Sequence, residues 1–175
     1  RTVIAAACAA AAMTFAPMSF AQQAPEKKDV TIAVGGKSLY YYLPLSIAEQ
    51  LGYFKDEGLN VKIVDFQGGS RSLQAVVGGS ADVVSGAFEH TISMQAKKQP
   101  MTAFVLQGRA PQLALVVSNK TMKDYKQLSD LKGKKVGVTA PGSSSQMVAN
   151  FILKKGGLGP KDVAFIGVGS SSGAV

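Results

Sequence analysis

Cysteine, histidine and tryptophan are almost missing from this sequence. Its 175 residues contain one Cys, one His and no Trp. A single thiol excludes a disulfide framework within the chain, and it excludes a metal site built from several thiolates. No cluster of His and carboxylate residues at metal-ligand spacing takes their place. We therefore expect no metal and no cofactor.

Charge is also sparse, and one sign dominates. Charged residues make up 17% of the chain, and 19 Lys or Arg against 11 Asp or Glu give a formal net charge of +8. A positive field helps to gather small anions. The lysines are spread along the chain and are not interleaved with exposed aromatics, so we do not expect nucleic-acid binding. Eight of them form adjacent pairs, which are Lys27/Lys28, Lys97/Lys98, Lys134/Lys135 and Lys154/Lys155.

An alanine-rich stretch with almost no charge runs from residue 3 to residue 20. Alanine is only weakly apolar, so the stretch would be a poor permanent membrane anchor. Pro17 then breaks the helix, and Ser19 and Ala21 are small residues at the positions that a signal peptidase reads. We therefore expect residues 1–21 to be a cleavable signal peptide and the protein to be periplasmic.

Two alternatives compete with a cleavable signal. Cys8 follows three alanines and suggests a lipoprotein site, but few residues precede it and the apolar run continues beyond it. A buried alanine-rich helix is disfavoured because nothing amphipathic organises the run. The chain begins with Arg instead of Met, which leads us to expect that its first residues are missing. Polar residues 22–28 are expected to be a linker.

Beyond the linker, short β-rich runs alternate with helical patterns. This alternation predicts an α/β protein with parallel sheet. The glycine pairs that follow several runs mark turns and helix ends. The expected strands are 29–34, 59–66, 81–85, 101–107, 113–117, 135–139 and 163–168, and the expected helices are 45–51, a helix following 68–70 and ending at 78–79, 89–97 and 143–155.

The polar stretch before Lys135 divides the pattern into two lobes. We expect residues 29–118 to form lobe 1, residues 119–134 to be a crossover, and residues 135–175 to begin lobe 2. Two strands and one helix are too few for a stable sheet. Lobe 2 is therefore expected to be incomplete in this chain.

Several motifs occur in a fixed order between residues 30 and 175. They include Tyr42-Leu43-Pro44-Leu45, Gly52-Tyr53-Phe54-Lys55-Asp56-Glu57-Gly58-Leu59, Gly78-Gly79-Ser80-Ala81-Asp82-Val83, Leu131-Lys132-Gly133-Lys134-Lys135-Val136 and Pro141-Gly142-Ser143-Ser144. Together they resemble the nitrate/sulfonate/taurine-type substrate-binding proteins of ABC transporters, a family that includes binding proteins for thiamine pyrimidine precursors. The resemblance implies a type II periplasmic-binding-protein fold, a ligand in the cleft between two lobes, and an ABC permease in the inner membrane as partner.

In open α/β sheets, ligands bind beyond the carboxyl ends of the strands. The first such loop carries Ser38 and three consecutive tyrosines, which cannot all face one core. We expect at least one of them to supply a flat wall and a hydroxyl to the cleft, with Tyr41 and Tyr42 as the candidates, and one or two of the three to cover the lobe surface instead. In the second loop Ser70 is expected to cap its helix, where free N–H groups favour an anion. Arg71 beside it could pair with the anion or face solvent.

The third loop holds the only histidine of the chain. Gly86, Phe88, Glu89 and His90 follow the third strand at a strand-to-helix junction. Glu89 and His90 would suit a polar or cationic ligand. Neighbouring residues on a helix point about 100° apart, so we expect at most one of the two to face the cleft.

The fourth loop belongs to lobe 2 and is rich in small polar residues. Gly142, Ser143, Ser144 and Ser145 would combine hydroxyls with helix N–H groups in a neutral cradle for an oxyanion. A Walker phosphate loop is excluded because no Lys-Ser/Thr pair follows the glycine. The alternative is that the serines only cap the helix.

The function predicted from these patterns is capture of a small anionic solute by a monomer, without catalysis. Two other functions remain open. One branch of the family makes the thiamine pyrimidine with a reactive histidine, but it is intracellular, which the export signal argues against. A ligand-sensing domain is the other alternative.

Overall fold

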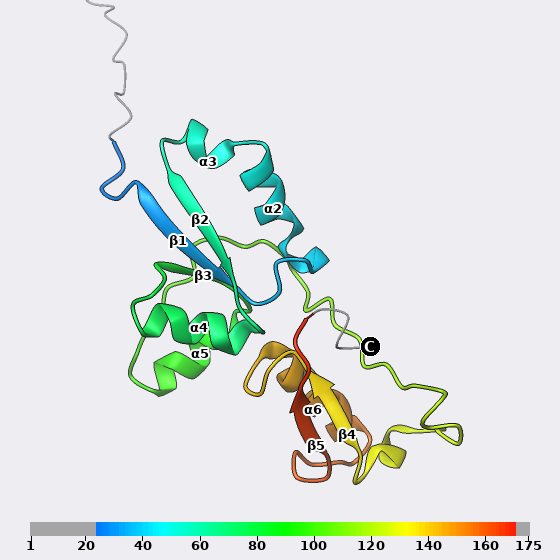
Figure 1. The fold of residues 1–175 in the computed structure, drawn as a ribbon. Coiled ribbons are helices and arrows are strands. Elements are labelled where there is room, and N and C mark those ends of the chain that lie inside the picture. The colour runs from blue at the N-terminus through cyan, green and yellow to red at the C-terminus, as the bar shows by residue number, and fades with distance from the viewer. Residues whose placement is uncertain (1–23, 171–175) are drawn as a thin grey trace, which may run out of the picture.

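The structure is a computed structural model that describes residues 24–170 (Figure 1). The expected signal peptide at residues 1–21 lies outside the described residues, and so does the end of the chain from residue 171. The described part holds two parallel sheets, one of three strands and one of two. The parallel α/β arrangement expected from the alternating pattern is confirmed. The lobe boundaries at residues 118 and 135 stay a prediction.

The first sheet contains β1 (Asp29–Val34), β2 (Asn60–Asp65) and β3 (Val83–Ser85) in the order β2-β1-β3. β1 lies in the middle and pairs in parallel with both neighbours, with Val34 opposite Asp65 and Ser85. All three strands therefore end at the same edge of the sheet. This common edge is where the candidate site is built.

Helices cover both faces of the first sheet. Alternate side chains of β1 point to opposite faces. Ile32 and Val34 belong to a core cluster with Tyr42 and Leu45, whereas Ala33 belongs to a cluster with Ala75 on the other face. Figure 1 shows one helix pair, α2 and α3, on one side of the sheet and the other pair, α4 and α5, opposite. The helical elements are η2 (Tyr40–Tyr42), α2 (Leu43–Gln50), α3 (Tyr53–Asp56), α4 (Gly69–Val77) and α5 (Glu89–Ala96).

The second sheet pairs β4 (Lys135–Val138) with β5 (Ala164–Gly167) in parallel, and α6 (Ser144–Lys155) connects the two strands. The short helix η3 (Leu128–Leu131) precedes them. The buried side chains of this unit form a core of their own: Leu131, Val136, Ala149, Leu153, Leu158 and Val163. Ala149 and Leu153 anchor α6 in this small core.

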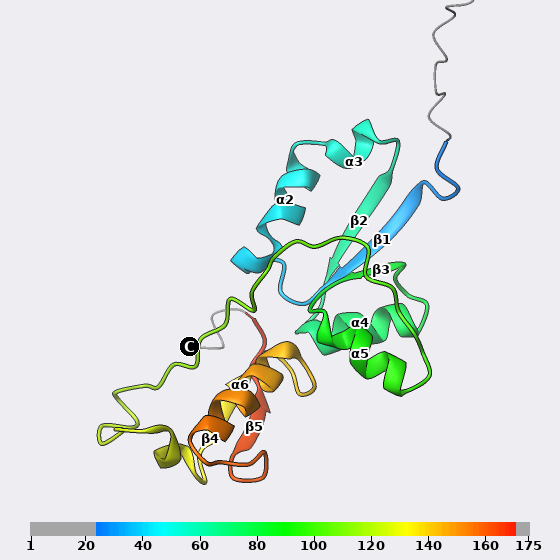
Figure 2. The same ribbon diagram turned by 180° about the vertical axis from the view of Figure 1, so that it is seen from behind.

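The prediction of strands at residues 101–107 and 113–117 is wrong. The structure assigns no strand to residues 101–117, which run as a connecting segment from the first sheet unit to the second (Figure 2). Their apolar side chains are largely exposed, as 74% for Phe104 and 84% for Val116 show. β-branched and aromatic residues favour an extended backbone, but a strand also needs a hydrogen-bonding partner. Among the described strands this segment has none.

Within residues 24–170, none of the helices combines the length and the apolar character needed to cross a bilayer.

Replacing Leu153 with alanine tests the core of the second unit. Leu153 is fully buried, so the truncation leaves a cavity and should lower the free energy of unfolding by about 3 kcal/mol. Urea denaturation followed by circular dichroism measures this change. The control is Ile92→Ala at a side chain that is 62% exposed, which should cost well under about 1 kcal/mol. Equal losses for the two variants would contradict the assignment of this core.

Candidate functional site

The edge at which the strands of the first sheet end lies against the corresponding edge of the second sheet. Gly68, before α4, lies so close to Ala140 that a Cβ added to it would be 2.9 Å from the Ala140 Cβ. Gly36, after β1, is similarly close to Ser170, after β5. Loops that follow four of the five strands therefore meet where the two sheet units touch.

Two helix N-termini are joined directly across this contact. The Ser70 N–H, in the first turn of α4, donates to the Ser143 Oγ at 3.0 Å, and the Ser143 hydroxyl donates to the Ser70 Oγ at 3.1 Å. The Ser70 hydroxyl in turn donates to the Pro141 carbonyl at 2.9 Å. Only 2% of Ser143 is exposed. These hydrogen bonds, called here the serine contact, tie the start of α4 to the start of α6.

The serine contact replaces the helix caps expected from the sequence. Ser70 was expected to cap α4, but the residue at that N-cap is Gly68, and Ser70 lies inside the first turn. Ser143 does occupy the N-cap of α6, yet its hydroxyl makes no capping hydrogen bond. The expectation for Ser70 is therefore wrong, and the simple capping alternative for Ser143 is wrong as well. Both hydroxyls are used to bridge the two units.

Glycine is required where β1 ends. A Cβ added to Gly35 would lie 2.4 Å from the Gly68 carbonyl carbon and 2.4 Å from the Gly69 nitrogen. Backbone cannot yield to such a contact, so a larger residue would push α4 away. Asp65, at the end of β2, shapes the same loop by accepting hydrogen bonds from the N–H groups of Gly36 and Lys37 at 2.7 and 2.9 Å. The sequence analysis did not identify Asp65 as a residue of the site. The signal that could have identified it is an acidic residue at the end of a strand that pairs with the glycine-rich end of β1.

His90 lies buried beside the start of α4. Only 5% of the residue is exposed, and its Nε2 has no hydrogen-bond partner among the described residues. A Cβ added to Gly69 would lie 3.2 Å from this nitrogen. Burial lowers the pKa of His90 below its ordinary value of 6.5, against a smaller opposing effect of the Glu89 carboxylate. The imidazole is therefore neutral at neutral pH.

Glu89 and Tyr41 lie next to the histidine. The Oε1 atom of Glu89 is buried and has no hydrogen-bond partner within residues 24–170. The Tyr41 hydroxyl donates to the Gly86 carbonyl at 3.2 Å. Burial raises the pKa of Tyr41 above 10.0, and the Glu89 charge adds to the rise. Tyr41 is thus bound to the loop that leads into α5, where Glu89 and His90 are the first two residues.

The other residues of the first and third loops lie less favourably for a ligand. Tyr42 is 4% exposed and packs in the core, while its hydroxyl accepts the Gly35 N–H at 3.1 Å. Burial raises its pKa. Ser38 is exposed, and Phe88 is 66% exposed on the outside of the helix start. The structure thus brings Tyr41, Glu89 and His90 together. Ser38, Tyr42 and Phe88 lie apart from this group. The ligand-binding roles of all six residues stay predictions.

The fourth loop is held by its own side chains. The Ser145 Oγ accepts the Thr139 N–H at 3.0 Å, and the Gln146 side chain accepts the Gly142 N–H at 2.7 Å. Ser144 is half-buried in the first turn of α6. Arg71, across the contact on α4, is exposed. The positive character of this region therefore comes from two helix ends and not from a buried arginine.

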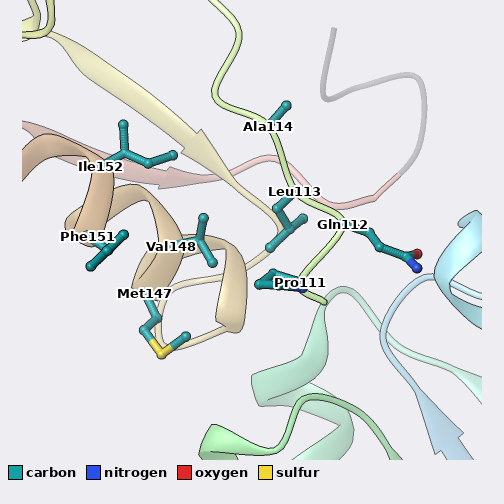
Figure 3. Close-up of a pocket in the computed structure, with 8 residues that line it drawn as sticks. All are labelled: Pro111, Gln112, Leu113, Ala114, Met147, Val148, Phe151 and Ile152. Carbon is teal, nitrogen blue, oxygen red and sulfur yellow. The ribbon is translucent and has the colours of Figure 1, made fainter. Parts of the chain in front are cut away.

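A separate concavity of about 630 Å³ lies between the connecting segment and α6 (Figure 3). Its lining is almost entirely apolar and carries no charged side chain, so it does not match the polar ligand expected from the sequence. The lining residues are Pro111, Gln112, Leu113, Ala114, Met147, Val148, Phe151 and Ile152.

Comparison with known proteins agrees with this architecture. The family model described as NMT1/THI5 like matches residues 40–174, which is most of the chain. The chain belongs to the NMT1/THI5-like family. The matched range includes Ser70, His90 and Ser143, and it begins after Gly35 and Gly36 of the loop that follows β1. The family resemblance inferred from the sequence motifs is confirmed.

Three proteins that are similar to this chain carry different names. A protein of Bordetella bronchiseptica RB50 is 66% identical in sequence and superposes with a TM-score of 0.82 over 85% of this chain. The alkanesulfonate-binding protein SsuA of Xanthomonas axonopodis pv. citri, bound to MOPS, has 21% identity and a TM-score of 0.57 over 83% of this chain. A 4-amino-5-hydroxymethyl-2-methylpyrimidine phosphate synthase of Schizosaccharomyces pombe is 27% identical over 80% of this chain.

The chain spans less than half the length of each of these proteins. It covers 46% of the Bordetella protein, 49% of the Xanthomonas protein and 39% of the synthase. The structural similarity confirms the expected type II periplasmic-binding-protein fold. For the Xanthomonas protein, which is 21% identical to this chain, the similarity shows a common fold and nothing more.

The buried histidine predicts a pH dependence of stability. Because its pKa is lower in the folded chain than in the unfolded chain, unfolding takes up a proton below about pH 6.5. The free energy of unfolding should therefore fall between pH 7 and pH 5 in wild type, and His90→Gln should reduce this slope. Asp82 and Asp130 have pKa values lowered below 3.8 by hydrogen bonds, so their contribution is lost only in more acidic solution. An unchanged slope in the variant, measured by urea titration, would contradict the burial of His90.

Proposed function

We propose that this protein captures a small anionic solute between its two sheet units and delivers it to an ABC permease. The observation that carries the proposal is the serine contact, because it brings the first turns of two helices face to face. The first N–H groups of a helix have no partner within it, and they carry partial positive charge. Two such ends form a site for an oxyanion such as a sulfonate or carboxylate.

The geometry also supports binding by closure of the two units. Ser70 and Ser143 come from different units, and their hydrogen bonds exist only when the units touch. A ligand that contacts both helix ends would stabilise this closed arrangement over an open one. The similarity to an alkanesulfonate-binding protein supports the same class of function. A periplasmic location, a monomeric state and a permease partner are parts of this proposal.

A second candidate function is enzymatic. It is favoured by the similarity to the pyrimidine phosphate synthase and by the buried, unpartnered His90 Nε2. The two functions differ in what happens to the bound molecule. A binding protein releases its ligand unchanged, whereas an enzyme of this type releases a product. Mass spectrometry of the ligand before binding and after release separates the two.

Solute capture predicts a rise in melting temperature with an anion from a panel of sulfonates, nitrate, carboxylates and pyrimidine phosphates. Binding to the folded state alone stabilises the protein by RT ln(1 + [L]/Kd). Differential scanning fluorimetry at ligand concentrations of 1 to 10 mM, in a buffer free of sulfonate, detects the rise. Absence of any shift across the panel would contradict the proposed function.

The serine contact predicts how a variant changes the affinity for the anion found in this way. Ser143→Ala removes a bridging hydroxyl worth about 1 kcal/mol, so the Kd should rise about fivefold. The matched control is Ser80→Ala, whose hydroxyl donates to the Ala75 carbonyl within the first unit. Isothermal titration calorimetry should show an unchanged Kd for this control. A loss of affinity in the control equal to that in Ser143→Ala would count against the role of the serine contact.

A further inference from the structure

Positive charge is spread through the sequence, but it is unevenly divided between the two sheet units. Residues 24–118 hold nine Lys or Arg against eight Asp or Glu, so their charges nearly balance. Residues 119–170, which include the second unit, hold nine Lys against three Asp. Most of the excess positive charge of the described chain therefore lies on the second unit.

The fold gathers six of these lysines at one end of the second unit. β4 and β5 are parallel, with Lys135 opposite Ala164, so both strands start at this end, and α6 brings the chain back to it. Figure 1 shows this end pointing away from the first sheet. The six lysines are all exposed and are called here the lysine end: Lys132, Lys134, Lys135, Lys154, Lys155 and Lys161.

Backbone contacts hold the segments of the lysine end together. The Gly133 N–H donates to the Asp162 carbonyl at 2.7 Å, and the Ala164 N–H donates to the Lys134 carbonyl at 3.0 Å. A Cβ added to Gly156, directly after α6, would lie 2.4 Å from a side-chain carbon of η3. Lysines from distant parts of the sequence thus share one surface.

The structure compensates few of these charges. Among the described residues, the lysine end has one ion pair, which joins the Lys132 Nζ to the Asp162 Oδ1 at 3.9 Å. The last turn of α6 accounts for two more lysines, because the helix dipole favours cations there. Lys134, Lys135 and Lys161 lie outside the helices and have no ion pair with a described carboxylate. A partner with negative charge would supply the missing compensation.

The chemistry of the lysine end favours a membrane surface over a partner of defined shape. All six charges are ammonium groups, which are hydrated point charges and do not form the bidentate hydrogen bonds of arginine. The described aromatic ring that a lysine of this end covers is that of Phe151, 4.9 Å from the Lys155 Nζ. Protein interfaces have an aromatic and apolar centre, and single-stranded nucleic acids bind to several stacking aromatics. The diffuse negative charge of lipid headgroups requires neither.

We propose that the lysine end docks on the surface of a membrane that contains anionic phospholipids. This inference goes beyond solute capture and can fail without it. The candidate site lies at the opposite ends of β4 and β5, so docking leaves the site facing away from the bilayer. Docking would also confine the protein to the plane of the membrane in which the proposed permease lies.

Binding to vesicles tests the proposal with the purified protein. Cosedimentation compares vesicles of phosphatidylcholine that contain about 30% phosphatidylglycerol with vesicles of phosphatidylcholine alone. Each lysine near an anionic surface contributes about fivefold, so the anionic vesicles should bind at least about 100-fold tighter. This ratio is the readout because an apolar contribution of residues 3–20 is common to both vesicles. Raising NaCl from about 50 mM to about 0.5 M should lower the ratio at least tenfold.

Variants assign the preference to the lysine end. The fourfold variant Lys134→Gln, Lys135→Gln, Lys154→Gln and Lys155→Gln should lower the ratio to below about tenfold. If circular dichroism shows that this variant is unfolded, Lys134→Gln with Lys135→Gln alone should still lower the ratio about 25-fold. The control makes the same change in net charge at exposed lysines of the first unit and should keep the ratio within about threefold of wild type. It combines Lys55→Gln, Lys62→Gln, Lys97→Gln and Lys98→Gln.

Three results would overturn the proposal. They are equal binding to the two kinds of vesicle, an equal loss of preference in the fourfold variant and its control, and no binding to either vesicle. In the last case, a duplex oligonucleotide that binds wild type but not the fourfold variant would identify a nucleic acid as the partner instead. None of these results bears on solute capture, which the melting-temperature panel and Ser143→Ala test separately.

Discussion

Two helix ends of the same electrical sign face each other in this protein, and serine hydroxyls hold them together. Each N-terminus carries the equivalent of about half a positive charge, so the arrangement of α4 against α6 is electrostatically unfavourable by itself. Ser70 and Ser143 compensate by donating to and accepting from each other across the contact. A bound anion would relieve the same repulsion more strongly, which explains why ligand binding and closure of the two units would be coupled.

The close packing of glycines makes this arrangement possible. Gly35 leaves room for the Gly68–Gly69 peptide, and Gly68 leaves room for Ala140 of the other unit. Side chains at these positions would separate the helix ends before any ligand could bridge them. The parallel register of β1 with its neighbours directs the loops that follow the three strands to this edge. Fold and site therefore depend on the same few backbone contacts.

Much of the fold could be predicted from the sequence, because strands and helices leave a local signature. The β-rich runs predict β1 and β2 to within one residue at either end, and glycines mark the end of α4 correctly. The segment 101–117 shows the limit of this approach. Its composition reports an extended conformation, but pairing depends on neighbours that local sequence does not reveal.

The candidate site was predicted less completely, and the reason is also physical. The loops that meet follow from the rule that parallel strands end at one edge. The bridging role of Ser143 depends on how the two units are placed relative to each other. A serine that only caps its helix would have the same local sequence, so the sequence does not distinguish the two roles. Burial separates Tyr42, whose ring packs in the core, from Tyr41, and no feature of three consecutive tyrosines distinguishes them. Similarly, neither the composition nor the spacing around His90 reveals that its ring is buried.

A crystal structure of the protein with its bound solute tests the central claim most directly. The account predicts electron density for an oxyanion between the first turns of α4 and α6, with its oxygens within hydrogen-bond distance of their backbone N–H groups. Density for the solute in the apolar concavity beside residues 111–114, with the two helix ends unoccupied, would contradict it.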